Sequence, residues 1–194
     1  MLNVLIGNQM IDKNNLINFF NLLSKKAKFH YEDFNEIDGK LGDGDLGITI
    51  LKGLEEIVKN KSHFEDDIGK IFLLCAKLFT KVSSSSFGTL TAISFMTLSK
   101  EYKDHKKIED KDIIKGLKKI IEAISIRGKS NIGDKTILDS LNSIIESIEA
   151  SNNSNLGLLA HEACNKSLIE FKNKECRIGR ARMFAEKSKS LDDP

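Results

Sequence analysis

The position of the single proline constrains this chain more than any other feature. Pro194 is the last of 194 residues, so no proline interrupts a helix anywhere before the end of the chain. Apolar residues recur with the 3.6-residue period of an α-helix in most segments, and no segment alternates with the two-residue period of a strand. The sequence therefore predicts an all-α fold.

The apolar stripes predict about eight helices with short connections, which favour antiparallel neighbours. The expected helices cover residues 11–27, 30–37, 47–58, 66–82, 88–102, 110–126, 134–148 and 156–171, with Asp134 as a predicted N-cap. A chain of this length fits one domain, and it can bury roughly 70% of the surface that its unfolded form exposes. We therefore expect residues 1–194 to form a single antiparallel bundle.

Charge, apolar run length and cysteine content bear on the partners and the location of the protein. The chain has 30 basic and 28 acidic residues, so its surface is mixed and does not favour nucleic acid. No apolar run approaches the length of a membrane span, and residues 1–15 lack the basic start and the cleavage site of a signal peptide. The three cysteines include no CxxC pair, which is typical of reduced thiols. We expect a cytoplasmic protein without a membrane partner.

The segment IDGKLGDGDLG, residues 37–47, has the composition of an oxygen-ligand loop. It holds four of the 13 glycines of the chain together with Asp38, Asp43 and Asp45. If the three carboxylates converge, each ionised pair at about 4 Å would repel by roughly 4 kcal/mol at an effective dielectric constant of about 20. That repulsion is comparable to the whole stability of a domain, about 5–15 kcal/mol. Convergence therefore requires a protonated carboxyl group or a bound cation, and hard oxygen ligands favour Mg²⁺ or Ca²⁺.

The surroundings of this loop favour Mg²⁺ with a nucleotide. An EF-hand is excluded because no glutamate closes a twelve-residue loop after Asp38. Mg²⁺ usually shares its site with phosphate oxygens, and the helix expected to begin at Gly47 offers an N-terminus that attracts anions. The alternative is a solvated Gly/Asp turn in a helical interaction protein.

A run of serines, Ser83–Ser86, separates two expected helices. It is either a flexible connector or a cluster of hydroxyl and amide donors at a helix start, and composition favours the connector. Two other motifs are rejected. Gly128-Lys129-Ser130 lacks the earlier glycine and the strand of a P-loop, and His161-Glu162 has no second histidine at position 165.

Four separated motifs together resemble one known family. The loop at 37–47 is similar to the metal-binding loop of the nucleotide-binding L subunit of bacterial dihydroxyacetone kinase. GDKTILDSL at 133–141 resembles the Gly-Asp-Lys-Thr-Met helix start of that family, and GRA at 179–181 with DP at 193–194 resembles its Gly-Arg-Ala and Asp-Pro-Gly pair. The resemblance spans residues 37 to 194.

The resemblance implies a bundle of eight antiparallel helices that holds ADP or ATP at one end through Mg²⁺, with two metal ions. In that family the ketone substrate is held by a separate K subunit, and a phosphotransferase-system M subunit can be a further partner. The implied function is the nucleotide-binding subunit of a kinase for dihydroxyacetone or a related small ketose, which transfers a phosphoryl group to substrate on the K subunit. The alternative is a non-catalytic, nucleotide-binding regulatory module of the same fold.

The resemblance also assigns site residues. It implies that Asp38, Asp43 and Asp45 are the metal ligands and that they act in catalysis together with Arg180. The expected nucleotide-binding positions are Leu46, Gly47, Thr49, Ser85, Ser86, Phe87, Gly128, Ile137, Arg180 and Asp193. The chain departs from the family at its Gly-Gly-x-Ser-Gly turn, which reads SSSFG at 84–88 here. This departure motivates the regulatory alternative.

Overall fold

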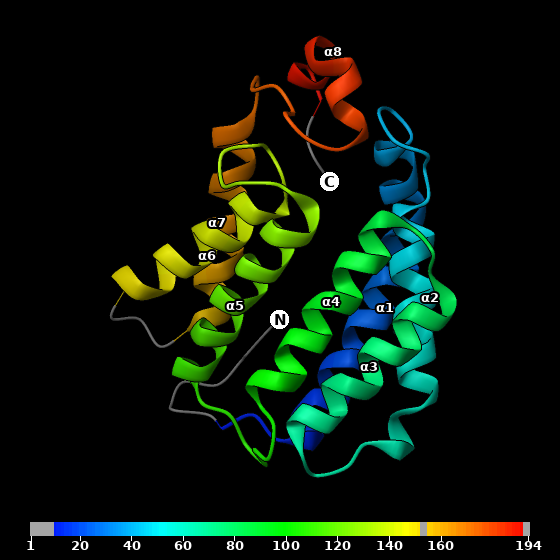
Figure 1. The fold of residues 1–194 in the computed structure, drawn as a ribbon, viewed down its shortest axis with the longest axis vertical. Helices are drawn as coiled ribbons and strands as arrows, with labels where there is room; N and C mark the ends of the chain where they lie inside the picture. The colour runs from blue at the N-terminus through cyan, green and yellow to red at the C-terminus, as the bar shows by residue number, and fades with distance from the viewer. Residues whose placement is uncertain (1–9, 152–154, 192–194) are drawn as a thin grey trace. The chain divides into compact units, whose positions relative to one another are not determined.

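The computed structural model describes residues 10–151 and 155–191. These residues form eight α-helices and two 3-10 helices (Figure 1). The elements are α1 Lys13–Asp38, α2 Leu46–Lys59, η1 Lys61–His63, α3 Ile68–Val82, α4 Ser86–Glu101, α5 Asp110–Gly128, α6 Ile137–Ala150, α7 Leu156–Phe171, η2 Arg180–Phe184 and α8 Ala185–Lys189. The predicted all-α class is confirmed. None of the helices in the described residues is long and apolar enough to cross a bilayer.

The first helix is longer than the sequence predicts. Two helices were expected, at 11–27 and 30–37, because the apolar stripe weakens after Ala27. The structure has one continuous helix, α1, since the intervening residues include no glycine or proline that would break it. Asp12 caps its start by accepting hydrogen bonds from the N–H groups of Asn14 and Asn15 at 2.8 and 3.1 Å. This length carries the chain directly into the Asp/Gly loop.

Contacts divide the chain into two compact units, and the first spans Ile11–Ile108. Within it α1 packs on α2, α2 on α3 and α3 on α4, and α2 also touches α4. The core of this unit is apolar, and its most buried side chains include Phe20, Ile57, Ile68, Ile71, Cys75 and Phe79. Ile11 and Ile108 exchange two backbone hydrogen bonds of 2.8 and 3.0 Å, which join the two ends of the unit.

Among the described residues, the second unit contains Met10 and the residues from Glu109 to Leu191. In it α6 packs on both α5 and α7, and η2 packs on α8. Thr136 caps α6, and its hydroxyl accepts from the N–H of Leu138 at 3.2 Å. The predicted cap, Asp134, was wrong because its carboxylate folds back to accept from Asn131 N–H at 2.7 Å. That residues 1–194 form a single domain remains a prediction.

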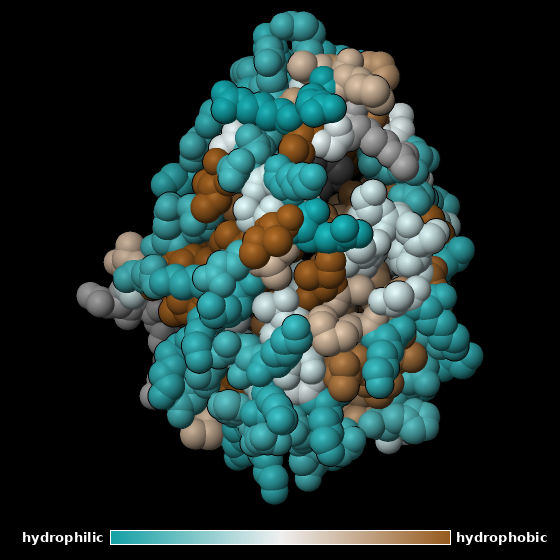
Figure 2. All heavy atoms as spheres, viewed as in Figure 1, coloured by the Kyte–Doolittle hydropathy of each residue, from teal (hydrophilic) through white to brown (hydrophobic). Residues whose placement is uncertain are grey.

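The surface agrees with the mixed charge of the sequence. On the face drawn in Figure 2, hydrophilic residues are the most widespread, and hydrophobic residues form smaller areas between them. The ion pairs between lysines and acidic residues in the described residues are mostly exposed. Lys118 and Glu149 form one of them at 2.6 Å. Such pairs contribute little to stability, so the apolar cores of the two units are the main source of it.

The cysteines should differ sharply in reactivity. None of the three forms a disulfide, and Cys75 and Cys176 are buried whereas Cys164 is half-buried. Burial raises the pKa of the Cys75 thiol to about 12, so this group stays protonated and unreactive at neutral pH. We expect Ellman's reagent at pH 8 to modify Cys164 first, and Cys75 and Cys176 only after guanidinium unfolds the protein. Fast reaction of all three thiols in the native protein would contradict this burial.

Candidate metal centre

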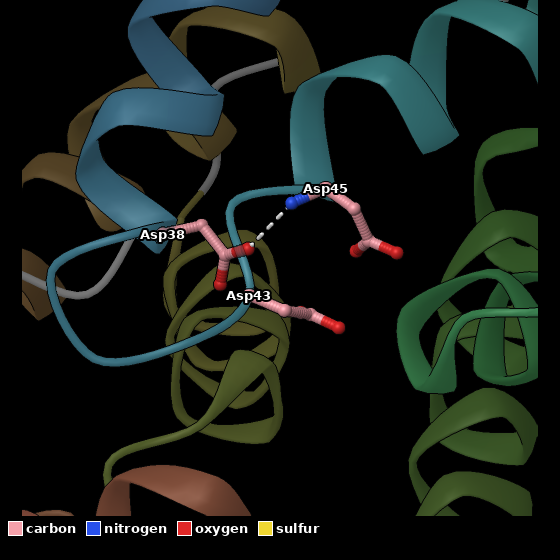
Figure 3. A group of neighbouring side chains, drawn as sticks. All are labelled: Asp38, Asp43 and Asp45. Atoms are coloured by element: carbon pink, nitrogen blue, oxygen red, sulfur yellow. Dashed lines mark hydrogen bonds between the residues drawn. The ribbon is translucent and has the colours of Figure 1, made fainter.

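Asp38, Asp43 and Asp45, here called the aspartate cluster, come together in space (Figure 3). Asp38 ends α1, Asp43 lies in the loop, and Asp45 immediately precedes α2. Each contributes one carboxylate oxygen to a group in which all three oxygens lie within 4.8 Å of one another. Asp43 is exposed, and the other two are half-buried. The three carboxylates therefore converge, which is the condition under which they need a cation or a proton.

Hydrogen bonds and glycines hold the loop in this shape. The Oδ2 atom of Asp38 accepts from the N–H of Asp45 at 3.0 Å, which pulls the two ends of the loop together. A side chain at Gly42 would overlap the Oδ1 atom of Asp38, so only glycine leaves room for that carboxylate. Gly44 has φ +71°, a value that residues with a Cβ adopt rarely. The glycines are thus required by the carboxylate positions.

The start of α2 lies directly beside the cluster. The side chain of Asp45 makes no capping hydrogen bond to this helix, and its carboxylate belongs to the cluster instead. Asn35, from the last turns of α1, takes over the cap by accepting from the N–H of Ile48 at 3.1 Å. Sequence reasoning missed Asn35, because the residue that it caps is 13 positions away. A helix N-terminus next to a cation site is suited to bind phosphate.

The serine run forms a capped helix start. The Oγ atom of Ser85 accepts from the N–H of Gly88 at 3.1 Å, so Ser85 is the N-cap of α4. The favoured prediction of a flexible connector was wrong, because this cap and the close packing of Gly88 on the Ser83 side chain fix the segment. A Cβ atom at Gly88 would overlap the Oγ atom of Ser83, so serine and glycine pack closely at this turn.

Hydroxyl groups link the starts of α2 and α4. The Oγ1 atom of Thr49 lies 3.1 Å from the Oγ atom of Ser85, which is in turn 3.3 Å from the Oγ atom of Ser83. Thr49 is buried, at 6% exposure. The contact brings the predicted binding positions Leu46, Gly47, Thr49, Ser85, Ser86 and Phe87 to two neighbouring helix starts. Ser83 was not among the predicted residues.

Removing the Ser85 hydroxyl should weaken this arrangement measurably. We expect Ser85→Ala to lower the free energy of unfolding by about 1 kcal/mol, because an N-cap and the contact to Thr49 are lost together. Urea unfolding followed by circular dichroism would measure it. Ser84→Ala is the matched control, since Ser84 is exposed and adjacent, and it should change stability by less than about 0.5 kcal/mol. Equal effects of the two substitutions would contradict the capping role.

Three further predicted residues belong to the second unit. Gly128 is the last residue of α5, Ile137 is the first of α6, and Arg180 is the first of η2. Ile137 is 41% exposed, so its side chain has apolar surface to offer a ligand. Asp193 lies outside the described residues. The roles of all four toward a nucleotide remain predictions.

The aspartate cluster fits a magnesium ion. Oxygen ligands of Mg²⁺ stand about 2.1 Å from the ion, so pairs of them are about 3 to 4.2 Å apart. The three carboxylate oxygens already lie within 4.8 Å of one another, which leaves only a small approach on binding. All three donors are carboxylates, the ligand type that Mg²⁺ and Ca²⁺ prefer.

Fold and loop together define an all-α protein that presents a cluster of carboxylates at a helix start. Comparison with known families makes this specific: the chain belongs to the DAK2 domain family, whose model matches residues 40–194. The resemblance to the dihydroxyacetone kinase L subunit is thereby confirmed.

Two curated relatives carry that name. The chain is 26% identical over 121 residues to the "PEP-dependent dihydroxyacetone kinase 1, ADP-binding subunit DhaL" of Listeria innocua serovar 6a, an alignment that covers 62% of this chain and 61% of that protein. It is 29% identical over 126 residues to the "PTS-dependent dihydroxyacetone kinase, ADP-binding subunit DhaL" of Lactococcus lactis subsp. lactis, covering 63% and 62%. The chain thus matches about three-fifths of the length of each relative.

Solved structures show the same fold. The dihydroxyacetone kinase from C. freundii in complex with AMP-PNP and Mg²⁺ superposes with a TM-score of 0.71 at 19% identity, covering 98% of this chain and 35% of that one. The native form of the same kinase gives a TM-score of 0.72 at 18% identity with the same coverage. Nearly the whole chain therefore shares an architecture with one part of a larger kinase.

Proposed function

We propose that this chain is the nucleotide-binding subunit of a kinase for dihydroxyacetone or a related small ketose. The observation that carries the proposal is the convergence of the aspartate cluster beside the start of α2. The names of the two relatives, both ADP-binding subunits of a dihydroxyacetone kinase, support it. We further propose a cytoplasmic location, in keeping with the reduced thiols.

The cluster is proposed to hold Mg²⁺, with two ions as the expected number, and through it the phosphates of ADP or ATP. When bound, the metal would neutralise phosphate charge. The N-terminus of α2 would favour the bound phosphates, and the Thr49 and Ser85 hydroxyls offer donors beside it. Gly128, Ile137, Arg180 and Asp193 are proposed as further nucleotide-binding positions.

Phosphoryl transfer mainly requires a protein to position the reactants and to neutralise the charge of the phosphates. The aspartate cluster and the donors at the α2 and α4 starts supply both for the nucleotide. The sequence offers no evident base or covalent nucleophile beside the loop, which agrees with a division of labour between subunits. We therefore propose that a K subunit holds the ketose, and that a phosphotransferase-system M subunit supplies the phosphoryl group to bound ADP.

Two measurements test this function. Calorimetric titration with ADP should show binding that requires Mg²⁺, and mixing the chain with a K subunit, a phosphate source and dihydroxyacetone should yield the phosphorylated ketose. Binding without transfer would favour the regulatory alternative, which the altered turn at 84–88 motivates. Absence of any ADP binding would overturn both functions and leave a helical interaction protein.

A further inference from the structure

Lys135 is a buried cation in an unusual backbone conformation. It precedes the cap of α6 and is only 5% exposed. Its φ angle is +59°, in the left-handed region that residues other than glycine, asparagine and aspartate seldom adopt. A buried ammonium group is unfavourable unless each of its donors finds an acceptor. Its surroundings should therefore explain why the chain tolerates it.

All three donors of this ammonium group reach backbone carbonyls of the C-terminal segment. The Nζ atom donates to the carbonyl oxygens of Lys174 at 3.1 Å, Ser188 at 2.9 Å and Leu191 at 2.9 Å. Hydrogen bonds from a charged donor are roughly twice as strong as neutral ones. One side chain thus fastens both ends of residues 174–191, the segment that carries η2 and α8.

Further hydrogen bonds connect the same two parts of the unit. The N–H of Arg177 donates to the carbonyl of Asp134 at 3.2 Å. Within the segment, the N–H of Cys176 donates to the Oγ atom of Ser188 at 2.9 Å, and Ser188 is fully buried. The turn around Lys135 is held in turn by Asp139, which accepts from the N–H of Thr136 at 2.7 Å. The ammonium group is therefore presented from a fixed turn.

The segment depends on such attachment because its own helices are short. η2 and α8 have five residues each, which is far below the length at which an isolated helix is stable. Gly179, with φ +69°, turns the chain immediately before Arg180. The order of the segment therefore comes from its contacts, among them the three hydrogen bonds of the Lys135 ammonium group.

We propose that Lys135 is a positioning residue that holds residues 174–191, and with them Arg180, in the conformation that binds the nucleotide. The proposal rests on the proposed function, in which Arg180 is one of the proposed nucleotide-binding positions. Lys135 itself does not touch the ligand and acts through the segment. It is a lysine rather than an apolar residue because three convergent carbonyls need donors.

The test compares Lys135→Met with Lys129→Met. Methionine keeps an unbranched, flexible side chain that is shorter by one heavy atom, and it removes the charge and the donors. Lys129 also has a left-handed backbone, with φ +51°, but its side chain is exposed, so the control reproduces the backbone effect alone. In the nucleotide-free protein we expect Lys135→Met to speed amide exchange in residues 174–191 by about tenfold or more. We expect ADP affinity to fall about tenfold with the helical circular dichroism unchanged.

Ser188→Ala provides a second route to the same segment if Lys135→Met aggregates. It removes the acceptor of the Cys176 N–H, so exchange should rise within residues 174–191 and ADP affinity should fall in parallel. Unchanged exchange in both variants would overturn the anchoring role. Faster exchange with unchanged ADP affinity would overturn the positioning role. Failure of the unsubstituted chain to bind ADP would instead contradict the proposed function, while the exchange result would still decide the anchor.

Discussion

Replacing Asp43 and Asp45 together by asparagine should remove the Mg²⁺-dependent part of ADP affinity and also raise the melting temperature of the metal-free protein. The two effects share one cause. The cluster brings three carboxylates within 4.8 Å, which is unfavourable until a cation offsets their charge. Asparagine keeps the shape of each side chain but removes the charge that both binds the metal and repels its neighbours.

The expected magnitudes make this variant decisive. We expect the dissociation constant for ADP with Mg²⁺ to rise by about a hundredfold or more, equivalent to about 2.7 kcal/mol. Relief of repulsion should stabilise the metal-free protein by about 1 kcal/mol, a modest value because Asp43 is exposed and screened by solvent. Calorimetric titration and thermal unfolding in the presence of a chelator would measure the two quantities.

A charge-matched control separates the cluster from net charge. Glu55→Gln combined with Glu162→Gln removes two negative charges at exposed positions elsewhere. It should alter neither ADP affinity nor melting temperature by a comparable amount. A variant that merely disturbs the fold would lose ADP affinity and stability together. A lower melting temperature for Asp43→Asn plus Asp45→Asn would therefore contradict the proposed repulsion among the three carboxylates.

Gly47→Ala should be among the most destabilising substitutions of a glycine in the chain. A Cβ atom at Gly47 would overlap the backbone carbonyl of Tyr31, which belongs to the facing helix α1. Backbone atoms cannot rotate away as a side-chain tip can, so α1 and α2 would have to separate. We expect a loss of about 3 kcal/mol or more in the free energy of unfolding, measured by urea denaturation.

Gly157→Ala is a closely matched control for this prediction. Gly47 and Gly157 are each the second residue of a helix, and each follows a leucine. A Cβ atom at Gly157 would have the Oδ1 atom of Asn155 as its nearest neighbour, at an ordinary 3.6 Å. Here the better helix propensity of alanine should prevail and stabilise the protein by up to about 1 kcal/mol. Similar effects at the two positions would contradict the close approach of α1 and α2.

The sequence predicted those features that depend on residues close together in the chain. The helical period predicted the class of fold, and the spacing of Asp38, Asp43 and Asp45 indicated a loop short enough for the carboxylates to meet. Local composition also misled in two places. It divided α1 near Ala27, where nothing breaks the helix, and it favoured a flexible connector at Ser85, where a cap orders the chain.

Features that depend on distant partners were beyond local patterns. Asn35 caps α2 across 13 residues, and Thr49 meets Ser85 across 36. Lys135 finds its acceptors as much as 56 residues away. In each case the residue type is common in loops and at helix ends, so the identity of the residue does not reveal its partner. The packing of the helices determines which polar groups meet.

The hydrogen bonds between Ile11 and Ile108 have a consequence for how such a fold can be built. They make the chain enter and leave the unit of α1 to α4 at a single point. A compact unit whose ends are neighbours can be inserted into another chain, or circularly permuted, without stretching its connections. The four helices that carry the aspartate cluster therefore form a unit that could be inserted or permuted, with new ends opened at the exposed residues Ser62 and His63 of η1.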